Sequence, residues 1–216
     1  MAVKKVILIG DSIKFGYFKY VHTALSGVAE VMHPNDSARF AEYMLRYVHE
    51  WKKEYGWPDD ADLVHWNVGL WDALELFRDK PLTSLEYYED VIGRLHKRLR
   101  MLFPKAKLVF ATSTAVQEAL YLDEFRRHNA NIQAYNAAAL RALAGTDEGI
   151  NDLYAVTSGC PKECYSDVTH FNCREGVQLV GGAVVDAICK QLDIRAAEVD
   201  MDAFVREEYS AKTIGY

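Results

Sequence analysis

The chain has no long apolar segment. No part of the sequence approaches the roughly 18 uninterrupted apolar residues that a membrane-spanning helix requires. The opening residues, MAVKKVILIGDS, place two lysines before an apolar stretch. This stretch is shorter than the hydrophobic region of a secretory signal peptide, and no small-residue cleavage site follows it. We therefore expect a cytoplasmic protein that does not associate with a membrane.

Cysteine is scarce, and its distribution argues against a disulfide framework. The four cysteines, Cys160, Cys164, Cys173 and Cys189, all lie in the last third of the chain, and a cytoplasmic compartment keeps thiols reduced. Three of them lie near His170, which raises a zinc site as an alternative, but their spacing is not the C-x-x-C of paired zinc ligands. Because free cysteine commonly behaves as a small buried hydrophobe, we predict no metal and no other cofactor.

Positive charge is in deficit, since 25 Lys and Arg stand against 31 Asp and Glu, for a net charge of −6. This balance disfavours attraction to the phosphates of nucleic acid, so no nucleic-acid partner is expected. Internal repeats and Pro/Gly-rich linkers are also lacking. At 216 residues the economical prediction is a single domain over residues 1–216. Its charged tail at 196–216 packs on the body of the domain or, in a homo-oligomer, on a second copy of the chain.

The chain does contain an alternation of short apolar runs and helical patterns. The runs are rich in branched and aromatic residues, which suits strands buried on both faces. The segments between them carry apolar residues at spacings of three and four, as amphipathic helices do. Because parallel strands need a crossover connection, the alternation predicts an α/β fold, a three-layer α/β/α sandwich around a five-stranded parallel sheet. The expected strands are 5–10, 28–32, 62–67, 107–112 and 150–156, and the expected helices are 37–56, 82–104 (with Thr83 or Ser84 as N-cap), 124–145 and 173–192.

The first apolar run ends in a way that suits catalysis. In VKKVILIGDSI the glycine lets the backbone turn sharply, so Ser12 lies at the end of a rigid strand, where a nucleophile would be useful. Ligands of parallel sheets bind outside the carboxyl ends of the strands. The segments that follow the expected strands, and so are candidates for the site, are 10–12, 33–37, 67–72, 112–114 and 157–170.

The segment SDVTHFN, just before the last expected helix, places Asp167 three residues before His170. A hydroxyl is a poor nucleophile at neutral pH and needs a base within hydrogen-bond reach, with a carboxylate to orient that base. We therefore predict a catalytic triad of Ser12, His170 and Asp167. Simpler interpretations stay open at this point: Gly-Asp-Ser is an ordinary strand exit and helix cap, Asp167 a turn cap, and His170 a partly buried histidine.

The segment VHWNVGLWD adds a side-chain amide. Asn67 falls at the end of an expected buried strand, where a carboxamide has no structural need, and Gly69 then lets the chain turn. An acyl-transfer site needs hydrogen-bond donors aimed at the developing oxyanion, and an asparagine side chain with backbone N–H groups provides them. The alternative is an Asx-type turn that ends the strand.

Together these segments resemble the GDSL, or SGNH, hydrolases, a family of esterases and lipases built on a flavodoxin-like α/β/α sandwich. VILIGDSI is similar to the first block of the family and implies Ser12 as nucleophile. Asp167-Val-Thr-His170 is similar to its D-x-x-H block. HNANIQAYNAAA (128–139) and INDLYAV (150–156) resemble segments common in its bacterial members. The resemblance extends from about residue 3 to residue 192.

The middle blocks depart from the family pattern. In GLWD (69–72), Trp71 stands where the family's G-x-N-D block has its oxyanion asparagine. The segment is similar to the N-x-G-x-x-D form of a bacterial branch, which implies that Asn67 supplies the amide. The glycine of the second block is not evident in VMHPNDSARF, so a backbone N–H near Asp36 or Ser37 takes its place. The implied oxyanion and substrate-binding residues are thus Asn67, Gly69 and Ser37.

Other residues near the strand ends are candidates for substrate contacts. His33 follows the second expected strand and His65 lies on the third, so each either reaches the rim of the pocket or packs in the body of the domain. Trp66, Trp71 and Tyr17 lie near strand ends, where they stack on a sugar ring or form the core or a pocket wall.

These observations lead to the hypothesis of a serine esterase that forms an acyl-enzyme and needs no cofactor. The resemblance implies a small-molecule ester substrate, above all an acetyl ester of a carbohydrate or a small alkyl alcohol. Two other classes stay open. One is a non-catalytic SGNH-like binding module whose altered middle blocks mark lost activity. The other is a flavodoxin-like domain that binds a phosphate or nucleotide, against which the aspartate beside Gly10 and the lack of G-x-x-x-x-G-K-[ST] argue.

Overall fold

Five parallel strands form the centre of the protein. The computed structural model describes residues 2–208, and for 205–208 it describes the backbone alone. The strand order is β2-β1-β3-β5-β7, and every pair in this sheet is parallel. This is the flavodoxin-like order, in which the chain starts inside the sheet and builds outward in both directions. The strands are β1 (Lys4–Ile9), β2 (Ala29–Met32), β3 (Leu63–Trp66), β5 (Lys107–Ala111) and β7 (Gly149–Asn151).

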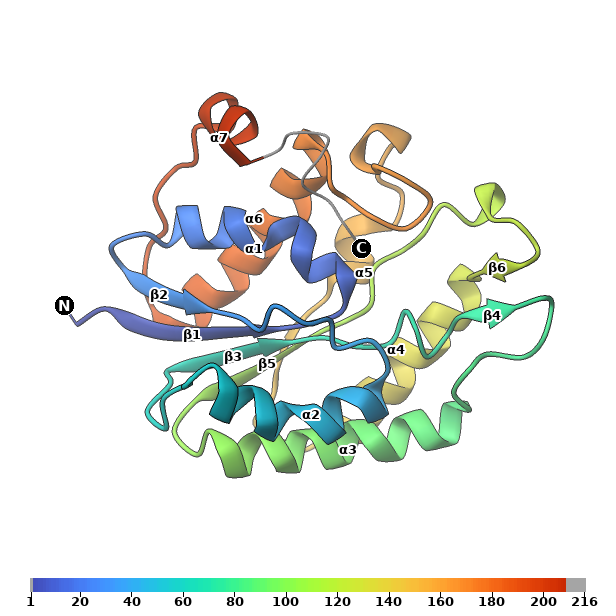
Figure 1. Ribbon diagram of the computed structural model, residues 1–216, viewed down its shortest axis with the longest axis horizontal. Helices are drawn as coiled ribbons and strands as arrows, with labels where there is room; N and C mark the ends of the chain where they lie inside the picture. Colours follow the sequence, from blue (N-terminus) through green and yellow to red (C-terminus); the bar gives the residue numbers. More distant parts are fainter. Residues whose placement is uncertain (1, 209–216) are drawn as a thin grey trace.

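Helices cover both faces of the sheet, which confirms the predicted α/β/α sandwich (Figure 1). On one face α1 (Ser12–Ala24) packs beside α6 (Arg174–Leu192). On the other face α3 (Leu85–Leu102) lies between α2 (Ala41–Glu54) and α4 (Asn129–Leu143). Because both faces are covered, the central strands can be apolar along their whole length.

The burial of the strands explains their composition. Val6, Ile7, Leu8 and Ile9 of β1 are all fully buried, so alternate residues pack against opposite helical layers. Each such side chain contributes about 1.5–3 kcal/mol by leaving water. β1 is therefore a rigid element, and whatever follows Ile9 begins from a fixed position.

The prediction of a strand over 150–156 is wrong beyond Asn151. Strand β7 ends at Asn151, and residues Leu153–Thr157 form the short helix α5. The reason lies in Asp152, whose Oδ1 accepts hydrogen bonds from the Ala155 N–H at 3.1 Å and from the Thr112 hydroxyl at 2.8 Å. A capping aspartate starts a helix even where the following residues are apolar.

Two expected helices begin later than predicted. The helix expected at 37–56 starts at Ala41, because the preceding segment forms a loop at the edge of the sheet. The helix expected at 124–145 starts at Asn129. Residues Phe125–Arg126 instead form β6, which pairs antiparallel with β4 (Glu75–Leu76) in a separate two-stranded ribbon. The other boundaries agree more closely, and Ser84 is the N-cap of α3, with Oγ accepting from the Tyr87 N–H at 3.4 Å.

The tail expected at 196–216 contains the helix α7 (Met201–Glu208). Met201 and Phe204 pack against Val177 of α6, and the rings of Phe204 and Tyr20 meet edge to face at 5.8 Å between centroids. The rest of that tail, 209–216, lies outside the described residues. Among the described helices, none has the length and apolar content needed to cross a lipid bilayer.

Candidate active site

Ser12 is the first residue of α1, directly after the exit from β1. Asp11 is the N-cap of this helix, and its Oδ1 accepts from the Ile13 N–H at 3.0 Å. The Ser12 N–H lies in the first turn, where no helical carbonyl is available to it. A Cβ on Gly10 would lie 2.3 Å from Asn67 Oδ1, so only glycine fits between the strand exit and that side chain. The Gly-Asp-Ser sequence therefore serves close packing as well as turning.

The structure brings Ser12 and His170 together. The Nε2 atom of His170 lies 2.8 Å from Ser12 Oγ, and its Nδ1 atom lies 2.8 Å from Oδ2 of Asp167. With a proton on Nδ1 shared with the carboxylate, Nε2 is the acceptor for the Ser12 hydroxyl. His170 is 7% exposed. The imidazole is thus held between an acid and an alcohol in the order that nucleophilic catalysis requires.

Asp167 organises the loop that carries His170, residues 166–172, called here the His170 loop. Its Oδ1 accepts the backbone N–H groups of Thr169 at 2.7 Å and of His170 at 2.8 Å, while Oδ2 faces the imidazole. The Ser166 N–H closes the loop by donating to His170 O at 2.8 Å. Partial burial on its own would raise the pKa of Asp167, but the hydrogen bonds from His170 and the two N–H groups outweigh it and hold the pKa well below the ordinary value. The carboxylate therefore stays ionised.

Asn67 lies against Asp11, the N-cap of α1. It begins the Asn67 loop (residues 67–72), which follows β3, and it is 2% exposed. Its backbone N–H donates to Ile9 O at 3.0 Å, and its carboxamide lies beside the carboxylate of Asp11. Burial raises the pKa of Asp11, and hydrogen bonds from the Ile13 N–H and the Asn67 side chain oppose this rise. Within the described residues Asn67 Oδ1 has no hydrogen-bond partner.

Gly69 packs closely against two buried hydroxyls of the core. Its φ is +143°, and a Cβ there would lie 2.5 Å from the Ser113 hydroxyl and 3.0 Å from that of Tyr88. The same two hydroxyls donate to Val68 O, at 3.3 Å and 2.9 Å respectively. Glycine is therefore needed at position 69 for close packing, which fixes the course of the Asn67 loop.

Ser37 lies in the loop between β2 and α2, beside the exit from β1. The next residue, Ala38, donates its N–H to Gly10 O at 2.8 Å, which ties this loop to the Gly-Asp-Ser turn. The Ser37 N–H itself donates to Oδ1 of Asp36 at 2.8 Å. That N–H is a donor to an incoming oxyanion only after it leaves this carboxylate.

Lys14 was not among the predicted site residues. Its side chain contacts the loop between β2 and α2. Its fully buried side chain donates from Nζ to Pro34 O at 2.5 Å and to Asp36 O at 3.2 Å. Burial lowers the pKa of Lys14 to about 7, although the nearby carboxylates of Asp36 and Asp11 favour the charged form. A lysine two residues after Ser12 was visible in the sequence, but its partners lie 20 or more positions away.

Asp72 closes the Asn67 loop and links it to the start of α2. It is fully buried, and both carboxylate oxygens accept from the Ala41 N–H, at 3.3 Å and 3.1 Å. Burial raises the pKa of Asp72 to about 7, while hydrogen bonds from Thr83 and Ala41 oppose the rise. This carboxylate takes the place of the side-chain cap that Phe40, the N-cap residue of α2, lacks.

Several candidates for substrate contact are buried instead. Trp66 and Tyr17 are 0% and 1% exposed, so neither can stack on a sugar ring. His65 is also fully buried, with Nε2 3.1 Å from Asn151 Nδ2, so it does not reach a pocket rim. Trp71 is partly exposed and meets Phe40 edge to face at 5.6 Å between ring centroids.

Metal ligation finds no support at the cysteines. Among the side chains that the structure describes, no group of three or more His, Cys, Asp or Glu is arranged to hold a metal ion. All four cysteines are free thiols, and Cys173 Sγ donates to Glu163 O at 3.1 Å. Burial raises the pKa of Cys164 to about 11, so this thiol stays protonated.

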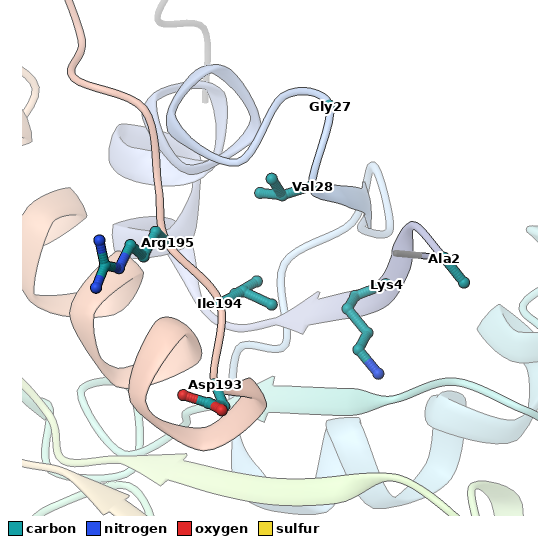
Figure 2. Close-up of a pocket in the computed structure, with 7 residues that line it drawn as sticks. All are labelled: Ala2, Lys4, Gly27, Val28, Asp193, Ile194 and Arg195. Atoms are coloured by element: carbon teal, nitrogen blue, oxygen red, sulfur yellow. The ribbon is translucent and has the colours of Figure 1, made fainter.

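A separate hollow of about 470 Å³ lies beside the amino end of β1 (Figure 2). Ser12, by contrast, follows the carboxyl end of that strand. The hollow is bounded by the start of β1, the turn before β2 and the residues after α6. In Figure 2 the charged ends of Lys4 and Arg195 point in different directions. In a ligand site, polar groups converge on the ligand. The charged groups of Lys4 and Arg195 do not converge, so this hollow does not resemble a binding site.

The sheet order and helical layers define an α/β/α sandwich of flavodoxin-like topology, and known ester hydrolases share it. A lipase/acylhydrolase from Enterococcus faecalis aligns over 91% of this chain and 100% of its own, with a TM-score of 0.69 and 19% identity. A GDSL-like lipase from Bacteroides thetaiotaomicron aligns over 87% and 88%, with a TM-score of 0.65 and 16% identity. An acetylxylan esterase from Geobacillus stearothermophilus aligns over 89% and 95%, with a TM-score of 0.65 and 15% identity.

At these identities the similarity is one of fold. No family model and no curated protein sequence matches the chain. The arrangement of Ser12, His170 and Asp167 is therefore the independent ground for a statement about chemistry.

Proposed function

We propose that the chain is an SGNH-type serine hydrolase that cleaves small acyl esters through an acyl-enzyme. The observation that carries the proposal is the pair of 2.8 Å contacts from His170, to Ser12 Oγ on one side and to Asp167 on the other. The structural neighbours described as lipases and acetylxylan esterases support ester hydrolysis.

In the proposed reaction Ser12 Oγ attacks the ester carbonyl and passes its proton to His170 Nε2. Asp167 holds the imidazole in the required tautomer and stabilises the imidazolium. The Ser12 N–H and the Asn67 amide stabilise the oxyanion, with a backbone N–H near Ser37 or at Gly69 as the third donor. His170 then protonates the leaving alcohol. Finally it activates a water that hydrolyses the acyl-enzyme and restores Ser12.

The proposed substrate is an acetyl ester of a carbohydrate. Two of the structural neighbours are described as acetylxylan esterases. Of the three aromatic residues near the strand ends, Trp71 alone is partly exposed, beside Phe40, so it is the one available to stack on a sugar ring.

The test is hydrolysis of p-nitrophenyl acetate by the wild type, Ser12→Ala and His170→Ala, with fluorophosphonate labelling of Ser12 in parallel. We expect turnover in the wild type, its loss in both variants, and labelling that disappears in Ser12→Ala. Ser26→Ala, in an exposed turn, is the matched control and retains full turnover. Unlabelled wild type without turnover would support a binding module instead. Acetate release from acetylated xylan then tests the carbohydrate substrate.

A further inference from the structure

Arg127 is a buried cation that the triad does not use. It is 3% exposed and lies between β6 and α4. Its Nε donates to Leu70 O at 2.5 Å, and its Nη1 donates to the Tyr121 hydroxyl at 3.3 Å. The guanidinium also lies over the ring of Phe125, 5.0 Å from its centroid. Leu70 belongs to the Asn67 loop, so one end of this arrangement contacts the proposed oxyanion region.

The other end contacts the His170 loop. The Tyr121 hydroxyl lies 2.5 Å from Oγ1 of Thr169, whose backbone N–H donates to Asp167 Oδ1 at 2.7 Å. Gln117 adds two contacts from the same segment, its N–H to Val168 O at 3.0 Å and its Nε2 to Asp167 O at 3.2 Å. The segment between β5 and α4 therefore touches the backbone and side chains that orient the catalytic carboxylate.

This segment is itself well anchored. The carboxylate of Glu118 accepts from His128 Nδ1 at 2.7 Å and from the Asn129 N–H at 2.8 Å, which joins its short 3-10 turn (Glu118–Leu120) to the start of α4. The ring of Tyr121 stacks on Phe125, with centroids 6.3 Å apart. Tyr121 is thus presented from a braced element rather than from a free loop.

We propose that Arg127, acting through Tyr121, is a positioning residue that fixes the His170 loop relative to the Asn67 loop, and hence the catalytic base relative to the oxyanion donors. This inference rests on the proposed function. Nucleophile, base and oxyanion donors come from separate loops, and a displacement of about 1 Å between such groups can reduce the rate about 100-fold. A bridge between two of these loops, here from Arg127 through Tyr121 to Thr169, is therefore expected to matter for rate.

The chemistry of the side chain supports this role. A guanidinium is a planar fork that donates in two fixed directions, here to a carbonyl and to a hydroxyl, which the single ammonium of lysine cannot reproduce. Burying a cation against neutral partners is also costly, and an apolar side chain of similar volume would serve stability as well or better. The charge additionally favours the ionised form of the buried Asp11. Packing alone thus gives no reason for an arginine at position 127.

The experiment measures kcat and KM for p-nitrophenyl acetate in Tyr121→Phe and Arg127→Lys. We expect kcat to fall about 10- to 100-fold while KM stays unchanged, since binding groups are kept and alignment is lost. Two matched controls remove similar groups elsewhere. Tyr87→Phe loses a hydroxyl that donates to Glu42 at 2.6 Å, and Arg100→Lys replaces an arginine that donates to Ala106 O at 2.7 Å. Both controls are expected to keep the wild-type kcat.

A double variant separates positioning from a general loss of stability. If the Tyr121–Thr169 contact is the link, Tyr121→Phe/Thr169→Val lowers kcat no further than the more damaging single substitution. Two results would overturn the inference while leaving the esterase proposal intact. One is a double variant whose loss of kcat is the sum of the two single losses in free energy, and the other is a kcat in Tyr121→Phe and Arg127→Lys that equals that of the controls. Should Arg127→Lys fail to fold, Tyr121→Phe, which removes one oxygen, decides the question. A wild type without turnover or Ser12 labelling would instead refute the proposed function, and this inference with it.

Discussion

The Nε2 atom of His170 lies 2.8 Å from Ser12 Oγ, although the two residues are 158 positions apart in the chain. Ser12 begins α1 and His170 precedes α6, and these two helices pack side by side on one face of the sheet (Figure 1). The packing of one helix pair thus sets the distance between the proposed nucleophile and its base.

Replacing Asp167 by asparagine should lower the kcat for p-nitrophenyl acetate about 10⁴-fold, because an amide no longer holds the His170 tautomer that accepts from Ser12. The fold should survive, since the asparagine oxygen can still accept the N–H groups of Thr169 and His170. Steady-state kinetics and circular dichroism test both statements. Asp59→Asn, at an exposed carboxylate paired with Lys52, is the control with unchanged kcat. A loss of less than tenfold in Asp167→Asn would contradict the assigned role.

Replacing Asn67 by alanine should lower kcat about 10²- to 10³-fold with little change in KM, because an oxyanion donor acts in the transition state and not in the bound ester. Asn131→Ala removes an amide that donates to Glu75 Oε1 at 2.8 Å, away from Ser12, and should leave kcat unchanged. An increase in KM with kcat intact would instead assign Asn67 to ground-state binding.

Replacing Gly10 by alanine should abolish most of the activity without touching a triad residue. The new Cβ would lie 2.3 Å from Asn67 Oδ1 and 3.1 Å from Lys14 Cβ, so Asn67 has to leave its position. Gly93→Ala is the matched control, because a Cβ at this position in α3 meets nothing within 4 Å. That control should gain about 0.5–1 kcal/mol of stability through helix propensity. Kinetics and urea unfolding on both variants distinguish the two effects, and full activity in Gly10→Ala would show that Asn67 tolerates displacement.

The buried His65 should make stability depend on pH. Burial lowers the pKa of His65 to about 4, from an ordinary value of 6.5. The folded state therefore binds the proton less readily than the unfolded chain, so the contribution is present above pH 6.5 and is lost as the pH falls toward 4. Compared with His65→Gln, the wild type should lose about 3 kcal/mol over that range. Urea unfolding of both proteins at pH 7 and pH 4 measures this difference, and a pH-independent difference would contradict it.

The fold was largely predictable because local patterns carry it. Strands buried on both faces are recognisable as short apolar runs. Amphipathic helices are recognisable by apolar residues that recur every three or four positions. The errors occurred where polar side chains override such patterns. Asp152 caps the helix α5 within the segment predicted as a strand. Phe125 pairs with Leu76 in a β-ribbon within the segment predicted as a helix. Only the first of these signals, a capping aspartate, was visible in the sequence.

The site was predictable only in part. The pattern of Gly-Asp-Ser and D-x-x-H pointed to Ser12, Asp167 and His170, which the structure brings together. The contributions of Lys14 and Arg127 could not be predicted, because a charged residue within a helical pattern is ordinarily on the surface. Their burial follows from carbonyl and hydroxyl partners supplied by distant loops.

The sequence by itself determined the alternation of the five sheet strands with the main helices, the glycine exit from β1 and the three-residue spacing of Asp167 and His170, since each depends on neighbours within a few positions. The tertiary structure alone decided that His170 reaches Ser12, that Trp66, Tyr17 and His65 are buried, and that the buried Arg127 donates to Leu70 O and to the Tyr121 hydroxyl. These outcomes depend on which helices share a face of the sheet and how deeply each side chain lies, and such long-range packing is not encoded in any local pattern.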